Sequence, residues 1–382
     1  MNNSFTQGPA FFEYFKAFKS DATSLGAIEA PFFTDSAITG EISVGPYAFL
    51  NPGAMSDEPG FFRPAIIFRL ETISVDLHTS LNRTDTDRYH GGTLLDELAA
   101  LVSILLGMRV QAGPVSRTFR DANDRGRPIA WFQEPWPSRR PIGHSPKLPW
   151  MGGSREISNT AFANLTDATL LNAKEASALI KAARGYQEAI WIGEWEPARA
   201  WLNLVSAIEA LSDFGKGRDA TDSEQLKIYN SEMAGKLIAI GGEELLTKLA
   251  PHLKSLVGST KKFCDFINAY LPEPPLQRPP DGFRISWTPN EIDRMMRSIY
   301  RHRSAALHEG TPFPMPMCGA PSISLDWPAP CELPQGLSSS SNQGSWLIAD
   351  TPMFLHVFEH IVRHSILKWW TEKIIRAKAQ TD

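Results

Sequence analysis

The sequence has few cysteines, no excess of positive charge and no long apolar run. Its 382 residues include only three cysteines, Cys264, Cys318 and Cys331, which are widely spaced and odd in number. This usage argues against a disulfide framework and a cysteine-ligated metal site, and it fits a reducing cytoplasm. The formal charge of −4 gives no global signature of nucleic-acid binding, so such a contact must rest on local basic surfaces.

Neither a signal peptide nor a membrane span is expected. The first 19 residues mix Glu13 with aromatic side chains and lack a basic start followed by a long apolar run. The most apolar later stretch, residues 98–110, contains Ser103, Gly107 and Arg109 and is too short to cross a bilayer. We therefore expect a cytoplasmic protein without a membrane segment.

The composition, 42% hydrophobic and 21% charged, allows two globular domains. We predict an α+β protein with a mixed α/β domain over residues 1–120, a connector over 121–165 and a helical bundle over 166–382. Alternating or β-branched apolar runs predict strands over 37–44, 47–50 and 64–77. The connector is rich in Pro, Gly, Arg and Trp, which is typical of an extended linker, although its arginines and aromatics would also suit nucleic acid.

Paired carboxylates stand at the start of a helix predicted from Thr93 to Leu106, with Asp96 at the capping-box position. Asp96 and Glu97 together invite an acid–base interpretation. Both fall in the first helical turn, where the helix dipole favours acids, so we favour a structural role.

Helical periodicity dominates the second half of the chain. It predicts a helix ending near Gly193, a second from Pro197 to Gly215, shorter helices over 223–240, 243–257 and 260–271, and a long last helix over 352–377. A Pro- and Ser-rich loop over 311–349 is long enough to be disordered or to act as a lid.

The helix predicted between Thr288 and Gly310 has well-marked ends. Thr288 suits the N-cap, Pro289 the first position, Glu291 the capping box and Gly310 the C-terminal stop. Its apolar residues recur at helical spacing and predict one buried face: Ile292, Met296, Ile299, Ala306 and Leu307.

Arg303 falls in the middle of this apolar face. A buried guanidinium needs a carboxylate, a phosphate or a partner surface. Glu209, beside the apolar stripe of the helix that follows Pro197, is the natural partner, in either a structural pair or a functional one. Three further arginines lie on the opposite, basic side: Arg294, Arg297 and Arg301.

The run Arg-Ser-Ala-Ala-Leu-His from Arg303 to His308 resembles the arginine–histidine motif of HEPN domains. Its residues are most similar to the motif of the Apea-like branch. Glu309, between His308 and Gly310, is a small departure from that branch. The phrase Ser-Ala-Ile-Glu-Ala-Leu over 206–211 is similar to the second HEPN helix. The resemblance covers residues 166–377, apart from an insertion, and implies a helical bundle that pairs with a second copy.

The HEPN resemblance implies a metal-independent endoribonuclease without cofactors, and bacterial relatives often look like toxins or anti-phage defence effectors. The RNA 2′-hydroxyl is the nucleophile, His308 exchanges protons and Arg303 neutralises charge on the scissile phosphate. Supporting roles fall to Ser304, Glu209 and Tyr300, and substrate contacts to Arg297, Arg301 and His302. The pairs Arg297–His302 and Arg301–His308 also fit the motif spacing.

Arg303 and His308 do not share a helical face, because residues five apart lie about 140° apart. Fraying at His308 or a partner protomer would have to bring the two groups together.

Three histidines, His356, His360 and His364, recur at a spacing of four on the last predicted helix. This spacing suits metal ligands. Without a nearby cysteine and with charged residues beside them, we favour surface or dimer-contact histidines and expect no metal site.

The alternative function is a non-catalytic module for dimerisation or for binding a nucleotide or partner, in which Arg303 anchors the core. Residues 1–120 would then recognise an unknown trigger.

Overall fold

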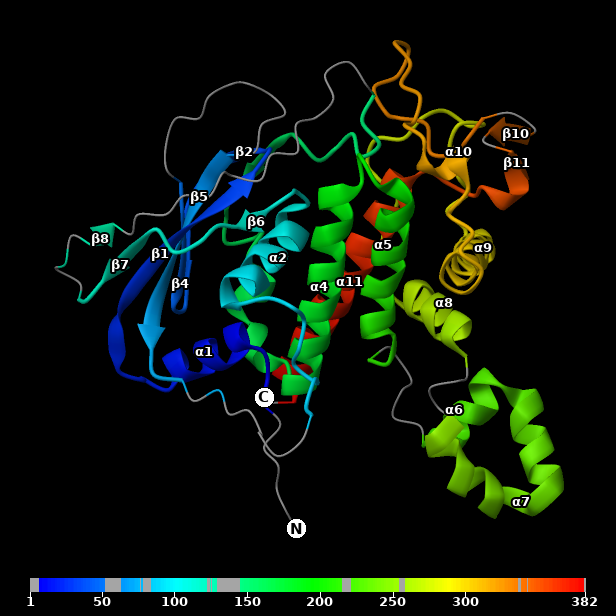
Figure 1. Ribbon diagram of the computed structural model, residues 1–382, viewed down its shortest axis with the longest axis horizontal. Coiled ribbons are helices and arrows are strands. Elements are labelled where there is room, and N and C mark those ends of the chain that lie inside the picture. The colour runs from blue at the N-terminus through cyan, green and yellow to red at the C-terminus, as the bar shows by residue number, and fades with distance from the viewer. Residues whose placement is uncertain are drawn as a thin grey trace.

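The computed structural model describes residues 7–51, 63–75, 77, 84–121, 124, 126–128, 145–214, 221–253, 258–335, 338–341 and 343–380. The fold is α+β, as predicted, with an antiparallel sheet on one side and stacked helices on the other (Figure 1). Residues 129–144, the middle of the predicted connector, lie outside the described part. No helix in the described ranges combines the length and apolarity needed to cross a membrane.

The sheet is organised around β1 (Ser24–Thr34), which pairs with β5, β6 and β7. Its strand order is β3-β4-β5-β1-β7-β8, with antiparallel pairing throughout. A separate parallel pair joins β2 to β9. The remaining bounds are β2 (Ala37–Thr39), β3 (Ile42–Val44), β4 (Tyr47–Leu50), β5 (Arg63–Ile73), β6 (Gln111–Ala112), β7 (Arg117–Phe119), β8 (Arg127–Pro128) and β9 (Ser154–Glu156).

One sequence prediction for this half is wrong, and two elements were missed. The single strand predicted over 37–44 is two strands, β2 and β3, separated at Gly40, whose φ of 79° breaks the extended chain. The central strand β1 was not predicted, because its burial does not alternate and Pro31 lies inside it. The first helix, α1 (Ala10–Lys19), was also not predicted.

The predicted helices appear in the predicted order. The helical bounds are α2 (Leu94–Leu106), α3 (Ala163–Thr166), α4 (Ala173–Ile192), α5 (Pro197–Ser212), α6 (Asp222–Tyr229), α7 (Ser231–Leu253), α8 (Ser259–Ala269), α9 (Pro289–His308), α10 (Met315–Cys318) and α11 (Leu355–Ala379). The short helices α3 and α10 were not predicted. The break predicted near residue 242 is a kink inside α7, where Gly241 and Gly242 have non-helical torsion angles. A further break at Asn230, which separates α6 from α7, was not predicted.

The predicted loop over 311–349 has structure of its own. Its described residues form α10, the hairpin of β10 (Ser338–Ser341) and β11 (Gly344–Leu347), and the start of a 3₁₀ turn over Ile348–Asp350. The described part of this loop is therefore not the disordered segment that was one of the two predicted alternatives.

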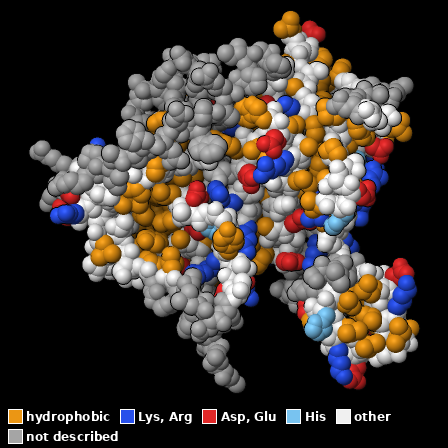
Figure 2. All heavy atoms as spheres, viewed as in Figure 1, with side chains coloured by type: hydrophobic (Ala, Val, Ile, Leu, Met, Phe, Trp, Pro, Cys, Tyr) orange, Lys and Arg blue, Asp and Glu red, His pale blue; other side chains and the backbone are white. Residues whose placement is uncertain are grey.

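One apolar core runs through both halves of the molecule, from Phe11 in α1 to Ile374 in α11. α2 lies between the sheet and the bundle and packs against α4, which packs on α5, and α11 lies beside both (Figure 1). In contrast, α6 and α7 form a projecting lobe with a small core of their own (Figure 2). The apolar core of this lobe is therefore separate from the main core, whereas the sheet and the bundle share one core.

α2 is apolar almost all round, and ten of its residues are buried. Its last carbonyl groups therefore need donors other than water. Arg363 of α11 donates to Ile104 O and Leu105 O, both at 2.7 Å. Arg155 of β9 donates to Leu106 O at 2.7 Å and to Gly107 O at 3.0 Å. Two guanidinium groups thus cap the negative end of the α2 dipole.

Gly107 is required at this helix end for two reasons. Its φ of 60° is left-handed, and a Cβ atom there would lie 2.8 Å from the Arg363 guanidinium carbon. A side chain would therefore both strain the turn and displace the arginine that caps the helix.

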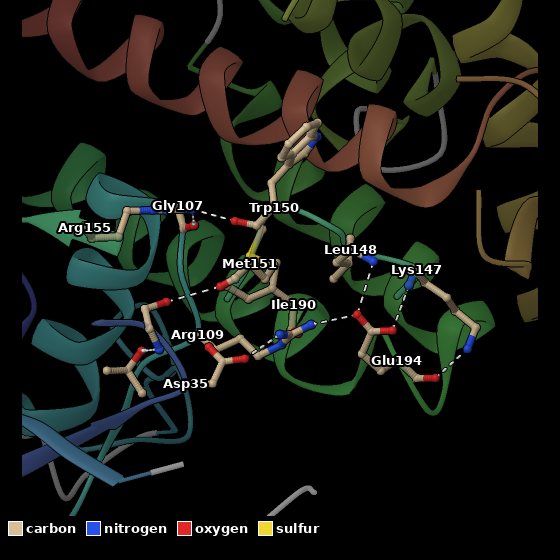
Figure 3. Close-up of polar contacts among 12 residues, drawn as sticks. Asp35, Gly107, Arg109, Lys147, Leu148, Trp150, Met151, Arg155, Ile190 and Glu194 are labelled. Carbon is tan, nitrogen blue, oxygen red and sulfur yellow. Dashed lines mark hydrogen bonds and ion pairs between the residues drawn. The ribbon is translucent and has the colours of Figure 1, made fainter. Parts of the chain in front are cut away.

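A buried arginine, Arg109, follows α2 along the chain. Arg109 is 1% exposed and donates to Ile190 O, to Asp35 Oδ2 at 2.7 Å and to Glu194 Oε1 at 3.1 Å (Figure 3). Glu194 also accepts the backbone N–H groups of residues 147 and 148. The cluster joins the sheet side, the connector and the end of α4, so the described part of the connector is tied down by specific contacts.

Replacing Arg109 with alanine is predicted to destabilise the protein by about 3–5 kcal/mol, because the change strands two buried carboxylates, Asp35 and Glu194. Urea unfolding followed by circular dichroism measures this change. The matched control is Arg199→Ala, whose exposed pairs with Glu188 and Glu196 are worth less than about 1 kcal/mol. Equal losses of unfolding free energy for the two variants would show that the buried ion pairs of Arg109 contribute no more to stability than exposed ones.

Candidate functional site

α9 carries the predicted motif on the outer side of the bundle, where it packs against α8 and α5 (Figure 1). Pro289 occupies its first turn, and Gly310, with a φ of 68°, follows its end. The predicted capping box does not form: Thr288 makes no side-chain cap, and Glu291 pairs with Arg294 instead. Leu307, predicted to be buried, is 53% exposed because the last turn extends beyond the core.

Arg303 forms the predicted ion pair with Glu209 of α5. Its Nη2 atom donates to Glu209 Oε2 at 2.7 Å, and the two side chains are 19% and 23% exposed. Tyr300 donates its hydroxyl to Glu209 Oε1, also at 2.7 Å. Burial, followed by the hydrogen bond to Glu209, raises the Tyr300 pKa to about 12, so this donor stays protonated at neutral pH. The Glu209 carboxylate thereby binds both Tyr300 and Arg303 of α9.

The Arg303 guanidinium keeps unused hydrogen-bonding capacity. Its Nε atom is buried without a hydrogen-bond partner in the described residues. Its Cζ atom lies 5.3 Å from the centre of the Tyr300 ring, whose other neighbour is Phe263 of α8. The arginine is therefore fixed in place by α5 and α9 but is not saturated.

His308 is the last residue of α9 and is exposed. Because the helix continues through it, the angle of about 140° between Arg303 and His308 holds in the structure. The fraying considered from the sequence does not occur. Within one protomer the two motif side chains therefore point away from each other, and Ser304 between them makes no side-chain hydrogen bond to a described residue.

The arginines of the basic side all face carboxylates. Arg294 pairs with Glu291, Arg297 with Asp293 at 2.7 Å, and Arg301 with Asp350 at 2.9 Å. These pairs are largely exposed, so each contributes little to stability. The basic side predicted from the sequence is thus a row of ion pairs.

His302 is held by the segment that ends the long loop. Its Nε2 atom lies 2.8 Å from the carbonyl oxygen of Asp350, so this nitrogen is the donor. Burial lowers its pKa. The predicted substrate contacts Arg301 and His302 therefore both bind Asp350, which places this segment directly beside the motif helix.

The histidines of α11 were expected at the surface or at a dimer contact; the structure buries His356, whereas His360 and His364 are partly exposed. His356 is 5% exposed, because this face of α11 is turned inward. His364 donates from Nδ1 to His360 O and accepts from Arg363 at Nε2, so both of its nitrogens are occupied. Among the described residues, no three or more His, Cys, Asp or Glu side chains are grouped to hold a metal ion.

The paired carboxylates at the start of α2 have structural contacts. Asp96 accepts the Thr93 N–H at 2.7 Å. Glu97 is 2% exposed and accepts the N–H groups of Ala10 and Phe11 at the start of α1, together with His90 Nε2. This geometry agrees with the structural role favoured from the sequence.

A double-mutant cycle between Glu209→Gln and Arg303→Met is predicted to give a coupling of about 1–2 kcal/mol, because the two half-buried groups are in direct contact. Glutamine keeps an acceptor for Tyr300, so the cycle isolates the ion pair. The control cycle on Glu291 and Arg294, which are exposed, is predicted to give less than about 0.5 kcal/mol. Chemical unfolding supplies both values, and equal couplings would show that burial adds nothing to the pair.

Acid is predicted to destabilise the fold through the α11 histidines. Burial, followed by the charge of Arg363, lowers the His364 pKa from 6.5 to about 3. Between these values the unfolded chain binds a proton that the folded protein does not, so stability falls as pH decreases below 6.5. His364→Gln, which keeps a donor and an acceptor, should reduce the slope of unfolding free energy between pH 5 and 6 by about 1.4 kcal/mol per pH unit. An unchanged slope would show that His364 titrates alike in both states.

Comparison with known proteins adds no assignment to this geometry: no family model, no curated protein and no solved structure matches the chain.

Proposed function

We propose that the protein is a metal-independent endoribonuclease of the HEPN type, with a site completed by a second copy of the chain. The observation that carries the proposal is the contact of Glu209 with Arg303 and Tyr300, which fixes the motif arginine while leaving His308 exposed. A toxin or anti-phage role is part of this proposal and rests on the resemblance of residues 303–310 and 206–211.

The orientation of the motif side chains supports a composite site. Arg303 and His308 lie about 140° apart on one continuous helix, so one protomer does not bring them to the same phosphate. α9 lies at the outside of the bundle, and its last turn exposes both Leu307 and His308. Pairing of two α9 helices about a two-fold axis would place the arginine of one copy near the histidine of the other.

The chemistry needs only these groups and the RNA. One His308 takes the proton of the ribose 2′-hydroxyl as that oxygen bonds to phosphorus. The bond from phosphorus to the 5′-oxygen breaks, and the same His308 returns its proton to the leaving oxygen. Arg303 neutralises charge on the phosphoryl oxygens through N–H groups that Glu209 does not use. The products are a 2′,3′-cyclic phosphate and a 5′-hydroxyl end.

A non-catalytic binding or dimerisation module is the second candidate. The observation that favours it is the same ion pair, because the Arg303 charge is already balanced by Glu209 within the protomer. In this case Arg303 anchors α9 on α5 and the exposed end of α9 binds a partner without cleavage.

His308→Ala is predicted to lower cleavage of generic single-stranded RNA by about 10²–10⁴-fold without changing the fold, because an exposed terminal residue has few contacts to lose. Cleavage should continue in EDTA and leave 2′,3′-cyclic phosphate ends, detectable by mass spectrometry. The control, His302→Ala, removes a contact to Asp350 and should have the smaller effect. If His302→Ala abolishes cleavage and His308→Ala does not, the Arg297–His302 pair is the catalytic one.

Mixing two inactive variants tests the composite site in the same assay. A heterodimer of Arg303→Met and His308→Ala keeps one intact arginine–histidine pair, so equilibrated mixtures should recover up to about a quarter of wild-type activity. No recovery, with wild type active, would place both groups in one protomer. No cleavage by wild type under any condition would favour the binding module.

A further inference from the structure

A cavity of about 350 Å³ lies between α11, the end of α2, β9 and the segment that precedes α9. Its walls are partly apolar, formed by Trp150, Met151, Pro275 and Leu276. Its polar groups come from Arg155, Arg363, Glu359 and the α11 histidines. No described residue of α9 lines it, so it is separate from the proposed ribonuclease site.

Glu359 offers a hydrogen-bond acceptor inside this cavity. Its side chain belongs to a residue that is only 6% exposed, and Oε1 accepts the Tyr186 hydroxyl at 2.6 Å. Its other carboxylate oxygen accepts no hydrogen bond from a described residue. A buried carboxylate that lines a cavity with one unused oxygen needs a donor from a ligand or from water.

Arg363 offers hydrogen-bond donors in the same cavity. It uses three of its N–H groups, on Ile104 O, Leu105 O and His364 Nε2, which leaves two of the five in a guanidinium without a described acceptor. Arg155 lies close enough for the charge of Arg363 to lower its pKa further, after burial itself. An anion placed here would relieve the repulsion between the two guanidinium groups.

The charges of the cavity favour an anionic ligand group. Two guanidiniums stand against one carboxylate, Glu359, while burial lowers the pKa values of His356 and His364 to about 3 and keeps both rings neutral. His356 adds a buried Nδ1 atom without a hydrogen-bond partner in the described residues. The polar floor of the cavity therefore presents both donors and an acceptor.

The mouth of the cavity presents flat and apolar surface. Trp150 is 43% exposed, and its ring extends toward α11 (Figure 3), while Leu276 is fully exposed. An aromatic ring stacked on the indole and covered by Leu276 would remove both from water.

We propose that this cavity binds a small molecule that carries an anionic group and a hydrogen-bond donor on one aromatic body. The anionic group contacts Arg155 and Arg363, the donor contacts Glu359, and the ring stacks on Trp150. An aromatic α-amino acid and a nucleoside monophosphate both meet this description, with a carboxylate or a phosphate as the anion and an ammonium or a base N–H as the donor.

Isothermal titration calorimetry of the full chain with L-phenylalanine and with guanosine 5′-monophosphate distinguishes these two sources. Saturable one-to-one binding of either ligand supports the proposal and shows whether the cavity takes an amino acid or a nucleotide. The matched ligands 3-phenylpropanoate, which lacks the ammonium, and guanosine, which lacks the phosphate, should each bind about 10-fold more weakly than their parents.

Three variants locate the binding. Glu359→Gln keeps an acceptor for Tyr186 and should weaken the parent ligand about 10-fold, so that phenylalanine and 3-phenylpropanoate then bind alike. Trp150→Ala should also weaken binding about 10-fold. The control, Leu325→Ala, removes a fully exposed leucine that does not line the cavity, and it should leave the affinity for the parent ligand unchanged. Absence of binding by both probes at millimolar concentration, or binding that Glu359→Gln and Trp150→Ala leave unchanged, overturns the proposal.

Discussion

A helix that is buried on nearly every side must satisfy its terminal carbonyl groups without water, and α2 sets this constraint for the whole molecule. Arg155 and Arg363 meet it by donating to the carbonyls of residues 104–107. Since one arginine comes from the connector and the other from α11, the same four hydrogen bonds position the sheet, the connector and the bundle. Arg109, three residues beyond the end of α2, joins the same parts of the molecule through its buried ion pairs with Asp35 and Glu194. Charged groups thus hold together an interior that is mostly apolar.

The charged groups of α9 differ from the arginines around α2, because they lie at the surface or are half-buried and do not join the sheet to the bundle. Glu209 positions Arg303 and also balances its charge, so the pair suits a catalytic arginine and a structural anchor equally. The exposed arginines of α9 are paired with carboxylates in contacts that contribute little to stability. Under the proposed function, the groups that complete the site at this helix come from outside the chain, from a second copy and from RNA. The cavity beside α11 differs, since its unused donors and acceptor are already enclosed.

Local signals predicted much of this structure. Thr93, Pro197 and Pro289 marked helix starts that the structure shows, and the periodic position of Arg303 led to its pairing with Glu209. β1 was not predicted, because it pairs with strands on both sides and lacks the alternation of a half-buried strand. The long-range contacts of Arg109, Arg155 and Arg363 were not predicted either, since their partners are 48 to 259 residues away along the chain. An arginine soon after a mostly apolar helix, as in Leu106-Gly107-Met108-Arg109, is the signal that could have indicated one of them.

The hydrogen bond from Arg363 to Ile104 can form only late in synthesis of the chain, because 259 residues separate its two ends. On the ribosome, α2 is made long before α11, so the carbonyls of Ile104 and Leu105 stay without Arg363 until nearly the entire bundle has emerged. Contacts of such long sequence separation slow folding and leave apolar surface open to association. The nascent sheet and α2 must therefore remain incompletely buried during synthesis, and a chaperone that covers apolar segments would act on this stretch in particular. Translation pauses after α2 would lengthen that exposure, whereas pauses after α11 would not.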